Sequence, residues 1–297
     1  MPARIIDGKA LAEAERQRTR DRVGVVTARG GSVALDAVIV DAGDNASRVY
    51  AANQARGCEA LGISYRLHEL PAGSSESQII DAIERLNADD SVTAIMVHMP
   101  LPPAVDSDLV KSSIDPAKDV EGVNPANIGN VIYDRSSLAP CTALATVRLI
   151  EAAGVELRGK RAVVIGASAT VGRPLAAMLM ARDATVISCN RWTWGLEDLA
   201  RTADVLVSAV GKPNLVTAEM VKPGAVVIDV GVNRVDDGKG GRRIVGDVVF
   251  DRVSQLAGWI TPVPGGVGPM TVAMLLSNVV EAAEVAASDA IRVTGGR

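Results

Sequence analysis

The chain has 297 residues, of which 48% are hydrophobic and 22% are charged, and its formal net charge is −4. That length exceeds one average domain and predicts two, while the slight acidity and the lack of a Lys/Arg-rich block argue against nucleic acid or an anionic membrane as a partner. No apolar run of transmembrane length and no signal peptide are expected, and three widely spaced cysteines outside any C-x-x-C pair indicate reduced thiols in a cytoplasmic protein.

The first half of the chain alternates predicted helices with predicted strands. Helices are expected over residues 5–26, 47–61 and 75–88, the last with Ser75 as its N-cap, and strands over residues 34–40, 65–70 and 92–99. The first of these strands is apolar apart from Asp36. Strands and helices in this rhythm predict a parallel sheet with helices on its faces.

The second half repeats this pattern after a connecting helix over residues 144–153. Strands are expected over residues 162–165, 185–188, 205–209 and 225–230, and helices from near Val171, over 196–201 and over 275–287. Residues 235–244 read as a charged, glycine-rich loop, and the last residues are expected to fray. Two α/β units joined by helices predict a cleft between them, and the loops after the strands are the expected ligand sites.

One of those loops carries a nucleotide-binding pattern. An apolar strand leads into a turn with the spacing G-x-S-x-x-x-G, in which Gly166 allows a sharp turn and Gly172 a close backbone approach. The helix that follows offers free N–H groups and a positive dipole end to an anion such as a dinucleotide pyrophosphate. Ser168 stands where the strict fingerprint has a second glycine, and any α/β protein can have a glycine turn after a strand, so the motif alone is weak.

A series of motifs resembles the methylenetetrahydrofolate dehydrogenase/cyclohydrolase family in register along nearly the whole chain. The motifs lie at Ile5–Lys9, Ala46–Tyr50, Val97–Pro102, Lys118–Gly122, Pro140–Thr142, Gly166–Ser168, Val171–Pro174, Gly211–Pro213, Asp229–Gly231, Gly246–Phe250 and Thr261–Thr271. The resemblance implies a substrate domain over residues 1–140, completed by a C-terminal helix over 273–297. It also implies a Rossmann-type NADP-binding domain over residues 141–272 and a homodimer.

The same resemblance implies an NADP-dependent methylenetetrahydrofolate dehydrogenase that acts on a small-molecule folate substrate and needs no metal. It assigns the catalytic positions to Tyr50, Gln54, His98 and Glu121. It assigns the substrate contacts to Ser47, Tyr50, Pro264, Gly265 and Gly266. It assigns the cofactor contacts to Thr142, Gly166, Ala167, Ser168, Gly172, Arg173, Arg191 and Val232.

The choice of NADP over NAD also follows from the residues. After the strand 185–188, a chain that selects NAD usually offers a carboxylate to the ribose hydroxyls, and residues 189–193 contain none. Arg191, and Arg173 from the glycine-loop helix, can reach a 2′-phosphate, which guanidinium groups bind well. Exposed arginines are often merely solvated, so these two residues are candidates.

Three polar positions on the substrate side depart from the family pattern. Gln54 stands one helical turn after Tyr50, where the family has a lysine, His98 replaces a glutamine and Glu121 replaces an aspartate that holds the pterin ring. The motif that begins at Pro140 also departs, because it reads Thr-Ala-Leu-Ala over residues 142–145 in place of the family's Thr-Pro-x-Gly. These departures have two interpretations: the sequence has drifted after a loss of activity, or the protein catalyses a narrowed or altered chemistry.

These departures should affect the two reactions of the family, hydride transfer from the methylene group and hydrolysis of the methenyl cation, to different degrees. Hydride transfer depends on position and electrostatics, whereas hydrolysis of the methenyl cation requires a group that takes a proton from water. Gln54 cannot be that base, which makes cyclohydrolase activity doubtful. His98 has the ordinary pKa, about 6.5, that suits proton transfer near neutrality, or it simply replaces the amide as a hydrogen-bond donor. Two alternatives stay open for the whole chain: a dehydrogenase for a modified one-carbon carrier, and a non-catalytic folate- or nucleotide-binding homologue.

Overall fold

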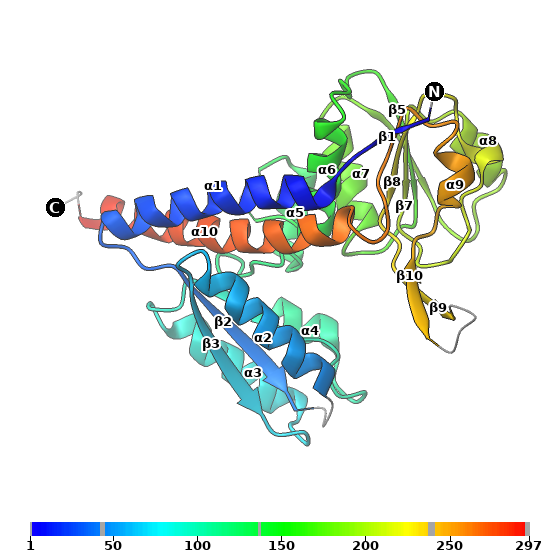
Figure 1. Ribbon diagram of the computed structural model, residues 1–297. Coiled ribbons are helices and arrows are strands. Elements are labelled where there is room, and N and C mark those ends of the chain that lie inside the picture. The colour runs from blue at the N-terminus through cyan, green and yellow to red at the C-terminus, as the bar shows by residue number, and fades with distance from the viewer. Residues whose placement is uncertain (1, 42–44, 136–137, 237–240, 295–297) are drawn as a thin grey trace. The chain divides into compact units, whose positions relative to one another are not determined.

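Two separate parallel sheets, each with its own helices, make up this chain in a computed structural model that describes residues 2–41, 45–135, 138–236 and 241–294 (Figure 1). The alternation of strands and helices expected from the sequence is confirmed in both. The six-stranded unit comprises Met1–Glu13, Val131–Asp134 and Pro140–Met274, and the three-stranded unit comprises Ala14–Asn130, Arg135–Ala139 and Leu275–Arg297.

The sheet of the six-stranded unit has the order β1-β11-β8-β7-β5-β6, and each neighbouring pair is parallel. From β5 the chain runs outward to β6 and then returns to β7 on the other side of β5, so the strand order reverses there. Ligands of open α/β sheets bind beyond the carboxyl ends of the strands at such a reversal. The strands are β1 (Arg4–Ile5), β5 (Arg161–Ile165), β6 (Thr185–Cys189), β7 (Val205–Ser208), β8 (Val226–Asp229) and β11 (Trp259–Ile260).

Helices connect these strands, and a hairpin projects from the unit. The helical segments are α6 (Cys141–Ala152), α7 (Gly172–Met180), α8 (Leu196–Arg201), η1 (Ala218–Met220) and α9 (Phe250–Val253). The hairpin pairs β9 (Asn233–Asp236) with β10 (Arg242–Val245) in an antiparallel register. The loop expected over residues 235–244 is corrected at both ends, because the two strands of the hairpin extend to Asp236 and from Arg242. Residues 237–240 lie outside the described residues, as do the last three residues of the chain.

The start of the chain packs with the six-stranded unit, whereas the family resemblance implies a substrate domain over residues 1–140. Arg4 and Ile5 pair in parallel with Trp259 and Ile260 as an edge strand of the sheet. The helix expected from residue 5 therefore starts later, as α1 (Gly8–Ala28). Asp7 caps it, because its Oδ1 atom accepts from the backbone amides of Lys9 and Ala10. A two-residue strand that pairs with a segment so distant in sequence leaves no local pattern to recognise.

The three-stranded unit places β2 (Ala34–Val40) between β3 (Ser64–Leu70) and β4 (Ala94–Val97) in a parallel sheet. One face packs on α3 (Glu76–Ala88), where the side chains of Val38, Ile79 and Ile83 are fully buried. Ser75 caps α3 as predicted, because its hydroxyl accepts from the Gln78 amide and the Gln78 side chain accepts from the Ser75 amide. The other helices are α2 (Asn45–Glu59), α4 (Ser107–Ser112) and α5 (Pro125–Ile132).

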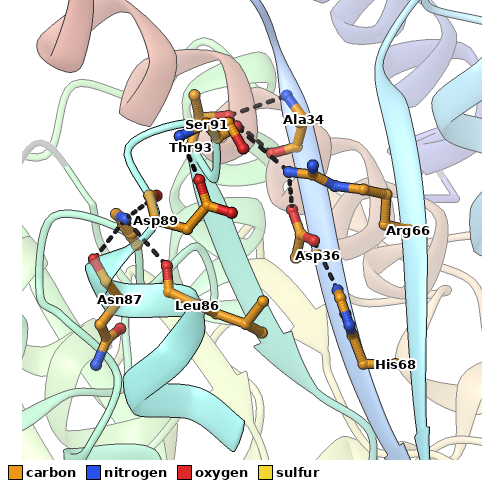
Figure 2. Close-up of polar contacts among 10 residues, drawn as sticks. Ala34, Asp36, Arg66, His68, Leu86, Asn87, Asp89, Ser91 and Thr93 are labelled. Carbon is orange, nitrogen blue, oxygen red and sulfur yellow. Dashed lines mark hydrogen bonds and ion pairs between the residues drawn. The ribbon is translucent and has the colours of Figure 1, made fainter.

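Asp36, the one charged residue in β2, is buried and paired on both carboxylate oxygens (Figure 2). Arg66 and His68 reach across from β3, with Nη2 of Arg66 2.7 Å from Oδ2 and Nε2 of His68 2.7 Å from Oδ1. Arg66 also donates to the carbonyl of Ser91 at 3.3 Å. A buried carboxylate is tolerated when its lone pairs are matched in this way, which explains the single break in an otherwise apolar strand.

The longest helix, α10 (Val267–Thr294), corrects the expectation that no apolar stretch reaches transmembrane length. Its segment Val267–Ser288 has 22 residues and is apolar enough to cross a membrane, but 56% of the most apolar part is buried inside the protein. Burial of this kind is typical of a core helix. In the three-stranded unit, Arg22 of α1 ties the two long helices together through ion pairs with Glu281 and Glu284.

Candidate active site

A cavity of about 660 Å³ lies at the carboxyl ends of β5, β6 and β7, where the strand order reverses. Cationic side chains line it, whereas aspartate and glutamate are absent from its described lining. The predicted cofactor residues Gly166, Ala167, Ser168, Arg173 and Arg191 all line this cavity. The remaining lining residues are Ile165, Asn190, Trp192, Thr193, Leu196, Ala209, Val210, Lys212 and Leu215.

The glycine turn forms one wall of this cavity, and its geometry explains the glycines. Gly166 has a φ of 109°, and a Cβ there would overlap the carbonyl oxygen of Ala209. A Cβ on Gly172 would overlap the carbonyl oxygen of Gly166, so Gly172 packs behind the turn. The hydroxyl of Ser168 accepts from the amides of Val171 and Gly172 at 3.2 and 3.4 Å. The serine that weakens the motif thus helps to cap α7.

The loop after β6 brings an arginine and a tryptophan to the opposite wall. The guanidinium carbon of Arg191 lies 5.0 Å from the ring centroid of Trp192, within the range of a cation–π contact. Asn190 shapes the loop through two hydrogen bonds. Its side-chain Oδ1 atom accepts from the backbone amide of Trp192, and its backbone amide donates to the Thr193 hydroxyl. Trp192 is 77% exposed, which leaves its ring available to a ligand.

The loop after β7 is held by a buried carboxylate that sequence reasoning missed. Asp247 is fully buried, and its Oδ2 atom accepts from the Ser208 hydroxyl and from the amides of Val210 and Gly211. Its Oδ1 atom accepts from the Lys212 amide and from Asn233 Nδ2. The motif that contains Asp247 marked it as part of the resemblance, but nothing in the sequence indicated that it supports the cavity wall.

A smaller cavity of about 260 Å³ in the same unit gathers the other predicted residues. Pro264, Gly265 and Gly266 line it together with Val232, which was assigned to the cofactor and does not line the larger cavity. Lys9, from the first turn of α1, also lines this cavity and was not predicted. Thr142 is the second residue of α6 and lines neither cavity.

The predicted catalytic residues and the predicted substrate residue Ser47 belong to the three-stranded unit, in which His98 follows β4. Ser47, Tyr50 and Gln54 lie three and four residues apart on one face of α2. The rings of Tyr50 and His98 meet edge to face, with centroids 5.7 Å apart. Tyr65 of β3, which sequence reasoning missed, places its hydroxyl 3.2 Å from Nε2 of His98. Burial lowers the pKa of His98 below its ordinary value, which favours the neutral imidazole.

Gln54 is buried, and one of its polar atoms is unmatched. Its Nε2 atom donates to the sulfur of Met96 at 2.8 Å, whereas its Oε1 atom has no hydrogen-bond partner among the described residues. A buried carbonyl oxygen without a donor costs free energy comparable to a lost hydrogen bond. Position 54 therefore carries a buried acceptor to which no described residue donates.

Glu121 also belongs to the three-stranded unit, and the segment that carries it runs beside β4. The carbonyl of Lys118 accepts from the Ile95 amide, and the Val97 amide donates to the Glu121 carboxylate. Burial raises the pKa of Glu121 to about 7, with the nearby Asp119 carboxylate adding to the rise and Lys111 opposing it. Glu121 therefore changes its charge near neutral pH.

Comparison with known proteins places both parts of the chain in one family. Residues 6–121 match the family model for the catalytic domain of tetrahydrofolate dehydrogenase/cyclohydrolase, and residues 140–287 match the model for its NAD(P)-binding domain. The chain is 48% identical over 283 residues to the bifunctional protein FolD of Moorella thermoacetica, a match that covers 95% of this chain and 99% of that protein.

Solved structures agree with this match. The bifunctional dehydrogenase/cyclohydrolase of Campylobacter jejuni is 40% identical with a TM-score of 0.90, and the match covers 95% of this chain and 99% of that one. The Trypanosoma brucei enzyme, solved with NADP and an inhibitor, is 37% identical with a TM-score of 0.89 and coverages of 97% and 99%. The names of these bifunctional relatives do not bear out the doubt over hydrolysis that position 54 raises.

Proposed function

This chain belongs to the tetrahydrofolate dehydrogenase/cyclohydrolase family, and we propose that it oxidises 5,10-methylenetetrahydrofolate with NADP as the hydride acceptor. The observation that carries this proposal is the 660 Å³ cavity at the ends of β5, β6 and β7, which has cationic walls and no carboxylate in its described lining. A cofactor with several phosphates requires such a lining. The relative from T. brucei was solved with NADP.

The residues of the cavity divide the task of holding NADP. The turn at Gly166 brings backbone close to the ligand, and the N-terminal end of α7 favours the negative pyrophosphate. Arg173 and Arg191 line the cavity as guanidinium donors for the 2′-phosphate, and the Trp192 ring makes a cation–π contact with Arg191. When bound, NADP supplies the nicotinamide ring that accepts the hydride.

The residues around His98 act on the folate. A hydride leaves the methylene carbon with the electron pair of its C–H bond, and the lone pairs of the two flanking folate nitrogens stabilise the methenyl cation that forms. The protein therefore needs to position the substrate, and it needs no titrating base for this step. We assign Ser47, Tyr50, Gln54, His98 and Glu121 to substrate positioning, with Glu121 accepting from the donors of the pterin ring. Pro264, Gly265 and Gly266 are assigned to the substrate as well.

Assembly and location are proposed on less direct grounds. We propose a homodimer, as the family resemblance implies, and the described residues leave one edge of β3 without a neighbouring strand, which a second copy can cover. Light scattering on the purified chain measures this directly. We also propose a cytoplasmic location, which is consistent with three buried, free cysteines.

A paired assay tests the proposed reaction on the purified full-length chain. NADPH formation from methylenetetrahydrofolate is followed by absorbance, beside a separate assay of methenyl hydrolysis. In parallel, the thermal midpoint is measured with and without NADP, because a ligand that binds only the folded chain raises it. NADPH formation supports the proposal. A raised midpoint without turnover instead supports a non-catalytic nucleotide-binding homologue.

A further inference from the structure

Tyr65 makes a contact with His98 that neither the sequence motifs nor the proposed reaction requires. The Tyr65 hydroxyl lies 3.2 Å from Nε2 of His98, which is 4% exposed. The Tyr50 ring meets the imidazole edge to face, and the His98 amide donates to the Val38 carbonyl at 2.8 Å. Backbone, ring edge and hydroxyl therefore hold the imidazole from three sides.

The direction of the Tyr65–His98 hydrogen bond follows from what else each group can bond. Among the described residues the Tyr65 hydroxyl has no other hydrogen-bond partner, so Nε2 is the only acceptor for its proton. Burial raises the pKa of Tyr65 above its ordinary value, so the phenol keeps that proton. A neutral imidazole has one accepting and one donating nitrogen, so an Nε2 atom that accepts leaves the proton on Nδ1.

We propose that Tyr65 is a positioning residue that fixes His98 in the Nδ1–H tautomer, so that His98 offers the substrate a hydrogen-bond donor. The one hydrogen bond of the His98 ring among the described residues is at Nε2, and Nδ1 is not among the fully buried atoms that lack a partner, so its N–H is accessible to a ligand. The role toward the substrate rests on the proposed function, whereas the tautomer does not.

This assignment separates two chemical roles for His98. A general base needs a free lone pair, and the lone pair of Nε2 is occupied by the Tyr65 proton. The Nδ1–H group donates, as the N–H of an amide does. His98 therefore stands in for the glutamine of the family pattern and does not replace the missing lysine.

Nitrogen NMR of the full-length chain, labelled with ¹⁵N in histidine, reads the tautomer directly. The chain has two histidines, so His98→Asn identifies the His98 signals by their loss. The spectrum is recorded near pH 8, well above the ordinary imidazole pKa of about 6.5. In the wild type we expect a protonated Nδ1 and an unprotonated Nε2. An Nε2–H tautomer in the wild type overturns the proposal.

Tyr65→Phe tests whether the hydroxyl sets the tautomer. We expect the two nitrogen signals of His98 to move toward exchange-averaged positions, because the second tautomer becomes populated. His68 lies on the same strand with its ring bonded to Asp36 (Figure 2), so unchanged His68 signals show that β3 is intact. Tyr133→Phe, at a residue that is 74% exposed, is the matched control. A single unchanged tautomer in Tyr65→Phe overturns the proposal.

Kinetics then separate this inference from the proposed function. If the chain oxidises methylenetetrahydrofolate, Tyr65→Phe should raise KM for the folate more than it lowers kcat, because it weakens a positioning contact. If the chain lacks that activity but the wild-type signals show the Nδ1–H tautomer, the proposed reaction fails while the role of Tyr65 stands. A lower kcat with an unchanged KM for the folate contradicts a positioning role.

Discussion

Replacing Asp247 by asparagine tests whether one buried carboxylate holds the cofactor loop. The side chain is fully buried and accepts five hydrogen bonds, three on Oδ2 and two on Oδ1. An asparagine keeps one accepting oxygen and brings an NH₂ group that faces donors. If its oxygen takes the place of Oδ2, the Lys212 amide and the Asn233 amide group lose their acceptor.

The cost follows from counting those donors. A buried donor left unsatisfied costs about 1–3 kcal/mol, so the loss of both predicts a destabilisation of about 2–6 kcal/mol. Asn233 can turn its amide and offer its oxygen to the new NH₂ group, in which case only the Lys212 amide is orphaned and the cost falls to about 1–3 kcal/mol. Since Val210 and Lys212 line the cofactor cavity, NADP affinity should fall as well.

Urea unfolding and NADP titration of the full-length chain measure both effects. Asp198→Asn is the matched control in the same unit, because that side chain is 83% exposed and its ion pair with Arg201 is worth about 0–1 kcal/mol. A destabilisation by Asp247→Asn no larger than that of the control would refute the reasoning, since it would mean that the five donors find other partners.

Four further predictions concern the two sites. Arg173→Ala and Arg191→Ala should each weaken NADP binding by about 10- to 100-fold, the loss of a hydrogen bond to a charged group, while leaving NAD binding unchanged; titration of both cofactors checks this, and an equal loss for NAD would contradict it. Glu121→Asp should lower the apparent dissociation constant for tetrahydrofolate substrates, because the shorter side chain restores the family geometry, and an abolished binding would show a pocket built for another ligand. Gln54→Lys should raise methenyl hydrolysis by about 10²–10⁴-fold with hydride transfer roughly unchanged, since it supplies a base in a buried position, and stopped-flow hydrolysis assays measure this. Burial raises the pKa of Asp229 from 3.8 to about 6, so the folded state holds this proton more tightly than the unfolded state. The protonated carboxyl group therefore contributes up to about 3 kcal/mol to the free energy of unfolding below about pH 4, and this contribution is lost as the pH rises through about 6. Urea unfolding of Asp229→Asn across that range should not show the loss.

Local sequence patterns predicted the elements and the loops that carry the cofactor cavity. The glycine turn after β5 and the loop after β6 line one cavity because parallel strands place their carboxyl ends together. Ser75 was recognisable as a cap because capping depends on residues three apart. The membership of the first 13 residues in the six-stranded unit was not recognisable, since β1 pairs with a strand from the other end of the chain.

Buried polar partners escaped prediction for a related reason. Asp36 interrupts an apolar strand in the sequence, but the arginine and the histidine that match it come from β3, and the register of two strands sets their meeting. Tyr65 lies in the same strand and carries no motif, so its hydrogen bond to His98 became apparent only when β3 and the end of β4 were placed in one sheet.

The three polar departures from the family pattern form a coherent set once Tyr65 is included. Gln54 presents a buried acceptor without a partner among the described residues, and Glu121 presents a carboxyl group with a pKa of about 7. His98 contributes the matching donor, because Tyr65 occupies its other nitrogen. Random drift after loss of activity has no reason to leave an unsatisfied buried acceptor, which costs about 1–3 kcal/mol unless a ligand or water supplies the donor. A buried acceptor, an oriented donor and a carboxyl group that titrates near neutral pH are the groups that the recognition of a polar ring uses, so the departures fit a site kept for a folate-like substrate better than they fit decay.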